Sequence, residues 1–410
     1  MYKFRHMNLV SKTLSSLVMF FIGVGAMYIA NIIITRFATE AITAQWATLI
    51  SFMMFGGAFA LFGFDQQLVR EPRAAKLIVK TAAVNITLTA IIGGLIGAKL
   101  GYTPNFFIGA FVIIGFAVCA LSFQWWRTNL RMTAAYVCNG SWRLSFLIGV
   151  IILFTSNKSQ LEHILMGAYL IGFLLIITLF FRLKPREDLI AIHSDIHTPK
   201  DIYIIGSSYF MASISLAIGA YGESLVVRTI GSTTDVALYF KSLVLFLFPG
   251  VMFNQYIAAV VGPLLRQNEK RAVSLLRKYR VFMLAALCAV WPGLIITGYI
   301  LGSLLYDEHF TPLALAALLS LTSCVRLIYI IPSNFVGITA NKTQLRWISA
   351  AYLGFALMFP LMSWGLAKAG LAVIFAVAIA NLINWTLRTL AGLSIVKQRF
   401  ALYPITPKAS

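Results

Sequence analysis

Long apolar runs separated by short polar stretches fill most of this 410-residue chain. A helix needs about 20 apolar residues to cross the hydrocarbon core of a bilayer, and only helices and closed barrels satisfy the backbone in lipid. The pattern therefore predicts an all-α integral membrane protein with about 12 transmembrane helices. The expected spans are 14–35, 43–65, 77–98, 105–126, 133–154, 162–182, 202–227, 236–262, 280–304, 311–337, 345–367 and 370–396.

Composition agrees with this pattern and excludes a soluble globule. The chain is 60% hydrophobic and 11% charged, and its mean hydropathy is +0.86. Twelve helices joined by short loops nearly exhaust its length, so no separate soluble domain is expected. The net charge of +20 does not indicate nucleic-acid binding, because membrane topology and anionic lipids account for it.

The distribution of Lys and Arg predicts the orientation of the spans. Of the 33 basic residues, most lie in the even-numbered loops and the two tails. The odd-numbered loops contain Arg36, Lys99, Lys158, Arg228 and Lys368. By the positive-inside rule, both termini are cytoplasmic, as in a multi-pass protein of the bacterial inner membrane. The basic stretch before the first span resembles a signal peptide, but the run is long and lacks a small-residue cleavage site, so we expect an uncleaved helix.

The chain divides into two halves that resemble each other weakly. The longest polar connector, 183–201, is charged and contains Pro185 and Pro199, as a domain boundary would. Arg36 precedes Trp46 by ten residues, and Arg228 precedes Tyr239 by eleven. We therefore expect an N-terminal six-helix bundle (1–182), a cytoplasmic connector and a C-terminal six-helix bundle with a short tail (202–410). Six-plus-six repeats are common among transporters.

Prolines interrupt several spans of the second half: Pro249, Pro263, Pro292, Pro332 and Pro360. Proline frees backbone groups that neighbouring helices or water must satisfy. Each proline alone indicates no more than a kink, but their concentration indicates that this half bends more.

Four basic residues lie within the spans: Arg143, Lys241, Arg326 and Arg388. Charge at bilayer depth is costly and usually marks a functional site. Arg326 and Arg388 can instead reach the cytoplasmic interface by snorkelling, and Lys241 the outer one. Arg143 is ten residues from either end of its span, so it is the least able to do so.

Polar residues accompany these cations at helical spacing. Thr322, Arg326, Tyr329 and Ser333 share one face of their span; Asn381, Asn384 and Arg388 share another; Asn139 and Arg143 are one turn apart. Such faces should point at the bundle interior or a water-filled cavity, because lipid cannot satisfy them.

Acidic residues are scarce in the spans. Glu223 lies within one, and Asp65 at the end of another. Either can bind a coupling ion, but Glu223 can equally form an ion pair with Arg228 or Lys241. Four buried cations against one buried anion favour an anionic ligand such as a pyrophosphate, for which Arg offers a planar fork. An exporter of cationic drugs would need the reverse.

Nothing in the sequence indicates an enzyme, a cofactor or a metal site. The four cysteines lie in predicted spans without metal-ligand spacing. His193, Asp195 and His197 have a spacing that can bind a metal, but the connector around them offers no further ligand. P-loop and nucleophile-elbow motifs are absent.

Several segments resemble the polysaccharide-flippase branch of the multidrug/oligosaccharidyl-lipid/polysaccharide (MOP) exporter superfamily. The similarity covers essentially the whole chain, including helix count and length, without an invariant signature. It lies in Thr35-Arg36, the run from Gly63 to Arg70, Tyr239-Phe240-Lys241, Ala340-Asn341-Lys342 and Ala369-Gly370-Leu371-Ala372. The chain departs from the pattern after Arg36, where Phe37, Ala38 and Thr39 replace the usual Leu-Gly.

The resemblance implies a MATE-like fold of two six-helix bundles around a cationic cavity, and a Wzx-type flippase that works by alternating access. Its substrate would be an undecaprenyl-pyrophosphate-linked repeat unit of O-antigen or capsule. Polymerase and chain-length proteins of the same pathway would be its partners, and an ion gradient would drive it. Carried over to this chain, the cavity cations are Arg36, Arg143, Lys241, Arg326 and Arg388.

Two other functions stay open. A cation-coupled multidrug antiporter would use Glu223. A membrane polymerase of the same pathway usually has a large outer loop with basic residues, whereas the loop between the ninth and tenth spans offers only Asp307, Glu308 and His309.

Overall fold

The structure is a computed structural model. It describes residues 2–71, 74–129, 131–156, 161–183, 198–255, 257, 279–306, 311–339 and 342–401. Every regular element in these ranges is a helix. Among the described residues, eleven helices are long and apolar enough to cross a membrane, or twelve when one bent pair is counted as a span. The predicted all-α, multi-pass architecture is therefore confirmed.

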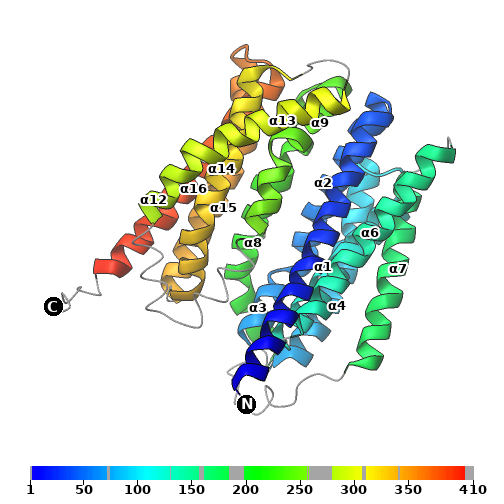
Figure 1. The fold of residues 1–410 in the computed structure, drawn as a ribbon, viewed down its shortest axis with the longest axis vertical. Coiled ribbons are helices and arrows are strands. Elements are labelled where there is room, and N and C mark those ends of the chain that lie inside the picture. The colour runs from blue at the N-terminus through cyan, green and yellow to red at the C-terminus, as the bar shows by residue number, and fades with distance from the viewer. Residues whose placement is uncertain are drawn as a thin grey trace. The chain divides into compact units, whose positions relative to one another are not determined.

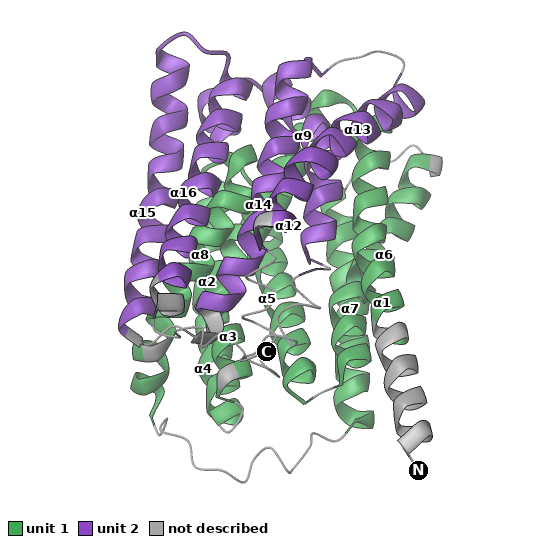
Figure 2. Cartoon of the chain, turned by 60° about the vertical axis from the view of Figure 1, so that its left-hand side comes forward, with its two compact units in different colours: residues 1–225 green, residues 226–410 purple. Residues whose placement is uncertain are grey.

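The chain forms two compact units, Met1–Leu225 and Val226–Ser410 (Figure 2). The division falls inside α8 (Pro199–Ile230). The sequence places it earlier, at the connector 183–201, of which residues 184–197 lie outside the described part. Most of α8 thus groups with the helices that precede it.

The main packing contacts of unit 1 join the helices from α1 to α7 (Figure 1). Besides most of α8, it contains α1 (Tyr2–Phe37), α2 (Glu40–Leu61), α3 (Phe64–Arg70), α4 (Ala75–Lys99), α5 (Phe106–Thr128), α6 (Met132–Ser156) and α7 (Leu161–Arg182). Helix α6 packs on α1, α5 and α7, and α5 also contacts α2 and α4. Helix α6, which carries Arg143, is thus packed against three helices of the unit.

Helices α1 and α6 cross at two glycines. A Cβ atom placed on Gly23 would lie 2.7 Å from the Cα atom of Gly140, and one placed on Gly140 would lie 3.3 Å from the Cα atom of Gly23. Small residues allow such close backbone approach, which drives helix association where lipid removes the hydrophobic driving force. The crossing fixes α6 three residues before Arg143.

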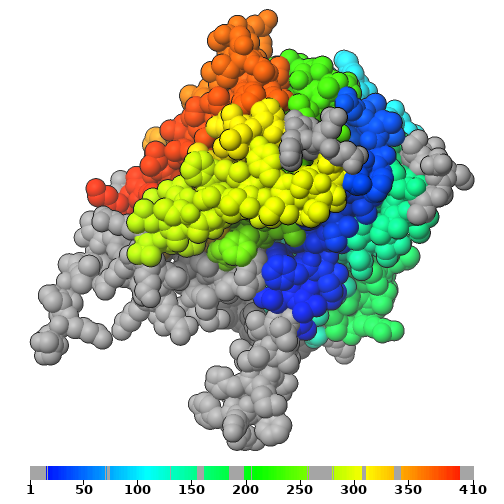
Figure 3. Space-filling view, turned by 45° about the horizontal axis from the view of Figure 1, so that its top comes forward, coloured from blue at the N-terminus to red at the C-terminus, as the bar shows by residue number. Residues whose placement is uncertain are grey.

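Unit 2 is built around α14. Its described elements are α9 (Thr233–Phe246), a short helix Phe248–Gln255, α12 (Tyr279–Ala285), the π-helical turn Ala286–Val290, α13 (Trp291–Leu305), α14 (Leu313–Thr339), α15 (Lys342–Lys368) and α16 (Val373–Ala401). The apolar stretch of α14 is 72% buried, whereas that of α12–α13 is 11% buried. Figure 3 shows α12 and α13, in yellow-green and yellow, on the face toward the viewer. Helix α14 is thus central and α12–α13 peripheral.

The prolines of unit 2 coincide with several irregularities in its helices. The eighth span bends by 49° between Phe246 and Phe248, because Pro249 cannot donate to the carbonyl of Leu245 and its ring crowds the preceding turn. Pro292 is the second residue after the π-helical turn. Pro332 and Pro360 lie inside α14 and α15, which continue past them. Pro263 lies outside the described residues.

The weak internal repeat corresponds to two similar helix junctions. Thr39 caps α2 by accepting from the amide of Ile42, and Ser232 caps α9 in a capping box with Asp235. Trp46 and Tyr239 each follow their cap by seven residues and are fully buried. The one-residue gap between the two sequences therefore falls between the arginine and the cap.

Helix α15 indicates the membrane level within unit 2. Trp347 and Trp364 are both exposed near opposite ends of this helix. Their separation of 17 residues corresponds to about 25 Å, close to the thickness of the hydrocarbon core, and tryptophan is enriched at both membrane interfaces. Lys368 lies beside Trp364, with Nζ 6.0 Å from the ring centre. The Trp347 end is the one that charge predicts to be cytoplasmic.

Candidate functional site

Two arginines of unit 2 are buried against three aromatic rings. We call this set the arginine–aromatic cluster: Arg326, Tyr329, Tyr352, Trp385 and Arg388. The Cζ atom of Arg388 lies 4.9 Å from the ring centres of Tyr352 and Trp385 and 5.5 Å from that of Tyr329. The Cζ atom of Arg326 lies 4.8 Å from the centre of Trp385. The Trp385 ring is thus in reach of both guanidinium groups.

Helical spacing on three adjacent helices assembles the cluster. Arg326 and Tyr329 are three residues apart on α14, as are Trp385 and Arg388 on α16, so each pair shares a face. Helix α16 packs on both α14 and α15, and α15 supplies Tyr352. The rings pack edge to face, with centres of Tyr329 5.8 Å from Tyr352 and 5.4 Å from Trp385.

The aromatic faces make this burial tolerable. Arg326 is 5% exposed and Arg388 1%, so neither snorkels to the interface. A desolvated cation over an aromatic face gains about 2 kcal/mol, which offsets part of the desolvation penalty of the charge. Tyr352 is five residues from Trp347, or about 8 Å of axial rise, so the cluster lies well inside the membrane level.

The charge of these helices has one sign. Residues 313–339, 342–368 and 373–401 contain Lys and Arg but no Asp or Glu. An arginine fork presents several N–H donors in a plane that matches phosphate oxygens. The cluster is therefore chemically suited to an anion and unsuited to a cation.

Polar residues on the same helices differ in what their groups already bind. The amide of Asn384 donates to Oδ1 of Asn381 at 3.3 Å, and both residues are buried. The hydroxyl of Thr322 donates to the carbonyl of Leu318 on its own helix, so its hydrogen is already used in a hydrogen bond and does not donate to a ligand. Ser333 is half-buried. Of the predicted lining, the two asparagines are the buried amide groups nearest in sequence to Arg388.

Arg143 in unit 1 has a different environment. It is half-buried on α6, and its Cζ atom lies 5.4 Å from the ring centre of Trp142. Tyr169 of α7 and Tyr221 of α8 lie within electrostatic reach of the guanidinium. Tyr169 is held by stacking on Trp142, with ring centres 4.8 Å apart. Asn139, one turn before Arg143, is also half-buried.

The other predicted cations lie apart from these groups. Arg36 is exposed at the end of α1, with Cζ 5.4 Å from the ring centre of Phe37. Counted from the Gly23–Gly140 crossing, Arg36 lies about 15 Å farther along the bundle than Arg143, so the structure does not bring these two together. Lys241 is half-buried on α9.

The two acidic candidates both lie in unit 1. Glu223 is 2% exposed on α8. Asp65 lies on α3, just beyond the left-handed residues Phe62 and Gly63 that end α2. Its Oδ2 atom accepts from Nε2 of Gln66 at 3.0 Å. Burial raises the pKa of the Asp65 carboxyl, while Gln66 and the charge of Arg127 oppose that rise.

Sequence reasoning missed Tyr352 and Trp385. Trp385 had a usable signal, because it lies three residues before Arg388. Tyr352 had none, since the rotation of α15 relative to α16 follows from packing. Within the described residues, no group of three or more His, Cys, Asp and Glu side chains can hold a metal ion. His193, Asp195, His197 and the outer-loop residues 307–309 lie outside those residues.

Comparison with known proteins shows the fold. No family model matches the sequence, and no curated protein matches it. Among solved structures, an inward-facing multidrug-resistance MATE transporter of the MOP superfamily aligns with a TM-score of 0.61 and 12% identity over 95% of this chain and 98% of that one. The lipid II flippase MurJ, in an inward closed conformation, aligns with a TM-score of 0.64 and 14% identity over 95% and 87%. The MATE multidrug transporter DinF-BH aligns at 0.60 and 15% over 95% of each chain.

Proposed function

We propose that this protein, which has the fold of MOP-superfamily transporters, is a flippase for undecaprenyl-pyrophosphate-linked oligosaccharide repeat units of O-antigen or capsule. The observation that carries the proposal is the sign of the buried charge. Helices α14 to α16 contribute two buried guanidinium groups and no Asp or Glu. A buried positive site attracts a pyrophosphate and repels the cationic compounds that a drug exporter would take.

In this proposal the protein's own residues divide the work. Arg326, Arg388 and Arg143 bind the pyrophosphate, while Lys241 and Arg36 line its path. Asn139, Asn381, Asn384, Thr322, Tyr329 and Ser333 offer polar and aromatic contacts to the glycan. The lipid tail stays in the hydrocarbon, and alternating access carries the head group from the cytoplasmic to the periplasmic leaflet.

The cellular setting belongs to the same proposal. The chain would lie in the bacterial inner membrane with both termini cytoplasmic, and its basic cytoplasmic side would attract the anionic carrier lipid. Polymerase and chain-length proteins would receive the product. Glu223 and Asp65 are the candidate groups for coupling to an ion gradient, since Glu223 is buried and desolvation raises the pKa of the Asp65 carboxyl.

Flipping in reconstituted liposomes tests the proposal. The assay follows a pyrophosphate-linked glycolipid with the wild-type chain and with Arg143→Ala. Lipid movement by the wild type that is lost in the variant supports both the flippase function and the assignment of Arg143 to the binding site. Movement that survives the substitution removes Arg143 from the site but keeps the flippase. No movement by the wild type, with or without proton and sodium gradients, contradicts the function.

A multidrug antiporter is the second candidate. The buried Glu223 favours it, since a buried carboxylate is the group that such a mechanism would use, and the fold likeness to MATE transporters supports it as much as the flippase. Resistance to cationic drugs on expression, abolished by Glu223→Gln, would favour this function. Absence of resistance together with glycolipid flipping would exclude it.

A further inference from the structure

Pro332 leaves one carbonyl of α14 without its helical partner. In an α-helix the amide of residue i donates to the carbonyl of residue i−4, and proline has no amide hydrogen. The carbonyl freed by Pro332 is that of Ile328, and α14 continues on both sides of it. In a membrane helix such a group has to find a donor from a neighbouring helix or water.

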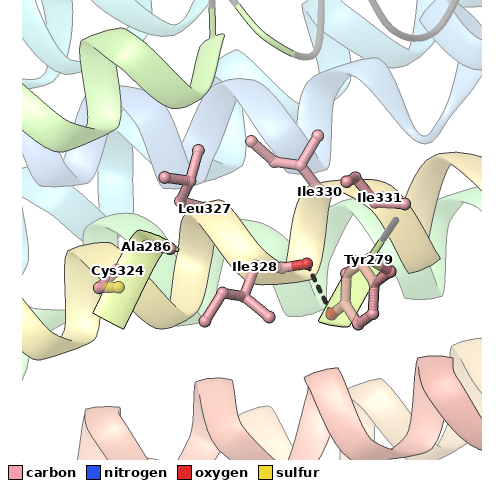
Figure 4. Packing of buried hydrophobic residues seen from close by; sticks show 7 residues of the cluster. All are labelled: Tyr279, Ala286, Cys324, Leu327, Ile328, Ile330 and Ile331. Atoms are coloured by element: carbon pink, nitrogen blue, oxygen red, sulfur yellow. Dashed lines mark hydrogen bonds between the residues drawn. The ribbon is translucent and has the colours of Figure 1, made fainter. Parts of the chain in front are cut away.

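The hydroxyl of Tyr279 provides that donor. It donates to the carbonyl oxygen of Ile328 at 3.0 Å, from the first described residue of α12 (Figure 4). Tyr279 is 6% exposed although the helix that carries it is peripheral. Cys324, Leu327 and Ile331 of α14 and Ala286 complete the apolar cluster around it. The interaction is therefore shielded from water, where a missing partner is most costly.

A second side chain contacts the α14 backbone one residue before Ile328. With its amide oriented so that both ends are satisfied, Asn254 donates to the carbonyl of Gly250 at 3.1 Å and accepts from the amide of Leu327 at 3.3 Å. Side chains that enter the helical hydrogen-bond ladder bend helices. Arg326 thus directly precedes two α14 backbone groups that side chains of neighbouring segments bind, the amide of Leu327 and the carbonyl of Ile328.

Tyr279 and the arginine–aromatic cluster lie on opposite sides of α14. Successive residues are about 100° apart around a helix, so Ile328 points about 200° away from Arg326, whereas Thr322, Tyr329 and Ser333 stay near the Arg326 side. The α14 backbone therefore links Tyr279 to the cluster, although the tyrosine lies on the other side of the helix.

We propose that Tyr279 is a positioning residue for the arginine–aromatic cluster. By holding the proline-freed carbonyl of Ile328, it fixes the α14 backbone next to Pro332 and with it the placement of Arg326 and Tyr329 against Trp385 and Arg388. The expected effect on transport rests on the proposed function. The effect of Tyr279 on the placement of Arg326 and Tyr329 does not. Loss of the hydroxyl leaves a buried acceptor without its donor, and α14 relaxes to recover one.

Four variants of the whole chain separate the effect of the Tyr279–Ile328 hydrogen bond from a general destabilisation of unit 2. Tyr279→Phe removes only the hydroxyl. Pro332→Ala restores an amide that can donate to Ile328 itself, so the double variant Tyr279→Phe/Pro332→Ala should no longer need the tyrosine. Tyr299→Phe is the matched control, because that hydroxyl also donates to a backbone carbonyl of unit 2, that of Thr311 at 3.1 Å, away from Pro332.

The readout is the rate at which phenylglyoxal modifies each arginine in detergent, measured by peptide mass spectrometry. We expect Tyr279→Phe to raise the modification rate of Arg326 about tenfold, in line with a lost buried hydrogen bond. The double variant should show no rise relative to Pro332→Ala alone. Tyr299→Phe should leave Arg326 protected, and Arg143 in unit 1 should react equally in all variants.

An unchanged rate for Arg326 in Tyr279→Phe would overturn the proposal. So would an equal rise in the Pro332→Ala background, or an equal rise in Tyr299→Phe. In the liposome assay, the half-saturating concentration of the pyrophosphate-linked lipid should be higher for Tyr279→Phe than for the wild type. In the double variant it should equal that of Pro332→Ala alone. A wild type that flips nothing contradicts the proposed function alone, because arginine modification still decides the role of Tyr279.

Discussion

The two units bury positive charge in two different ways. In unit 1, Arg143 is half-buried beside one ring, that of Trp142, and near the hydroxyl-bearing Tyr169 and Tyr221. In unit 2, Arg326 and Arg388 are almost fully buried and share the ring of Trp385. Arg143 is partly exposed and has phenol groups near it, whereas Arg326 and Arg388 form part of a packed core.

The difference predicts different consequences of substitution. A partly exposed cation beside one ring can be removed with less effect on packing, so its loss should be seen mainly in ligand binding. A cation packed on three rings contributes to the fold of its unit, so its loss should be seen in stability as well. Substitutions in both units can break this distinction or sharpen it.

The largest effect is expected from Arg388→Ala. It removes a fully buried large side chain and leaves a void against three aromatic rings, which should lower the free energy of unfolding by about 3–5 kcal/mol. Arg143→Ala should lower it by less than about 1 kcal/mol. Thermal unfolding in detergent measures both. Arg388→Met removes the charge but keeps much of the side-chain volume, so it separates the two contributions. Equal losses of unfolding free energy in Arg388→Ala and Arg143→Ala would contradict the difference between the two units.

The next effect concerns transport. Arg143→Ala should reduce the initial rate of glycolipid flipping about 100-fold, since hydrogen bonds to charged groups contribute about 1.5–3 kcal/mol. Arg143→Lys keeps the charge but loses the planar fork, so its rate should lie between those of Arg143→Ala and the wild type. A lysine variant no better than alanine would indicate that geometry rather than charge matters at this position.

A smaller effect should follow from the glycine crossing that holds α6. Gly23→Ala places a methyl group 2.7 Å from the Cα atom of Gly140, so α1 and α6 have to separate, at about 1–3 kcal/mol. Gly25→Ala is the matched control, because nothing lies within 4 Å of a Cβ atom there. If both variants unfold at the same temperature, the crossing does not hold Arg143 in place.

The smallest effect concerns Asp65 and pH. Burial raises its pKa in the folded protein, so the stability contributed by the protonated carboxyl is full below the unfolded pKa of about 3.9 and is lost as the pH rises through the folded pKa. The stability of Asp65→Asn relative to the wild type should therefore increase between pH 4 and pH 8. Glu40→Gln, at an exposed position, is the control. A constant difference would contradict the assignment.

The sequence was sufficient for the helices but not for the cluster. Apolar runs of membrane length predicted the spans, and the prolines indicated the bend before Pro249, because both signals are local. Helical spacing put Arg326 with Tyr329 and Asn384 with Arg388 on common faces. It could not show that α15 turns Tyr352 toward α16, that Tyr279 binds the carbonyl of Ile328, or that Arg36 lies far from Arg143. Each of these depends on how separate helices rotate and slide against one another.

The central claim is that buried cations select a pyrophosphate. Flipping of two lipids with the same glycan and tail, one with the pyrophosphate and one without, tests it most directly in liposomes that contain the wild-type protein. We predict that the pyrophosphate-linked lipid crosses and that its phosphate-free counterpart does not. Equal rates for the two lipids would contradict the claim.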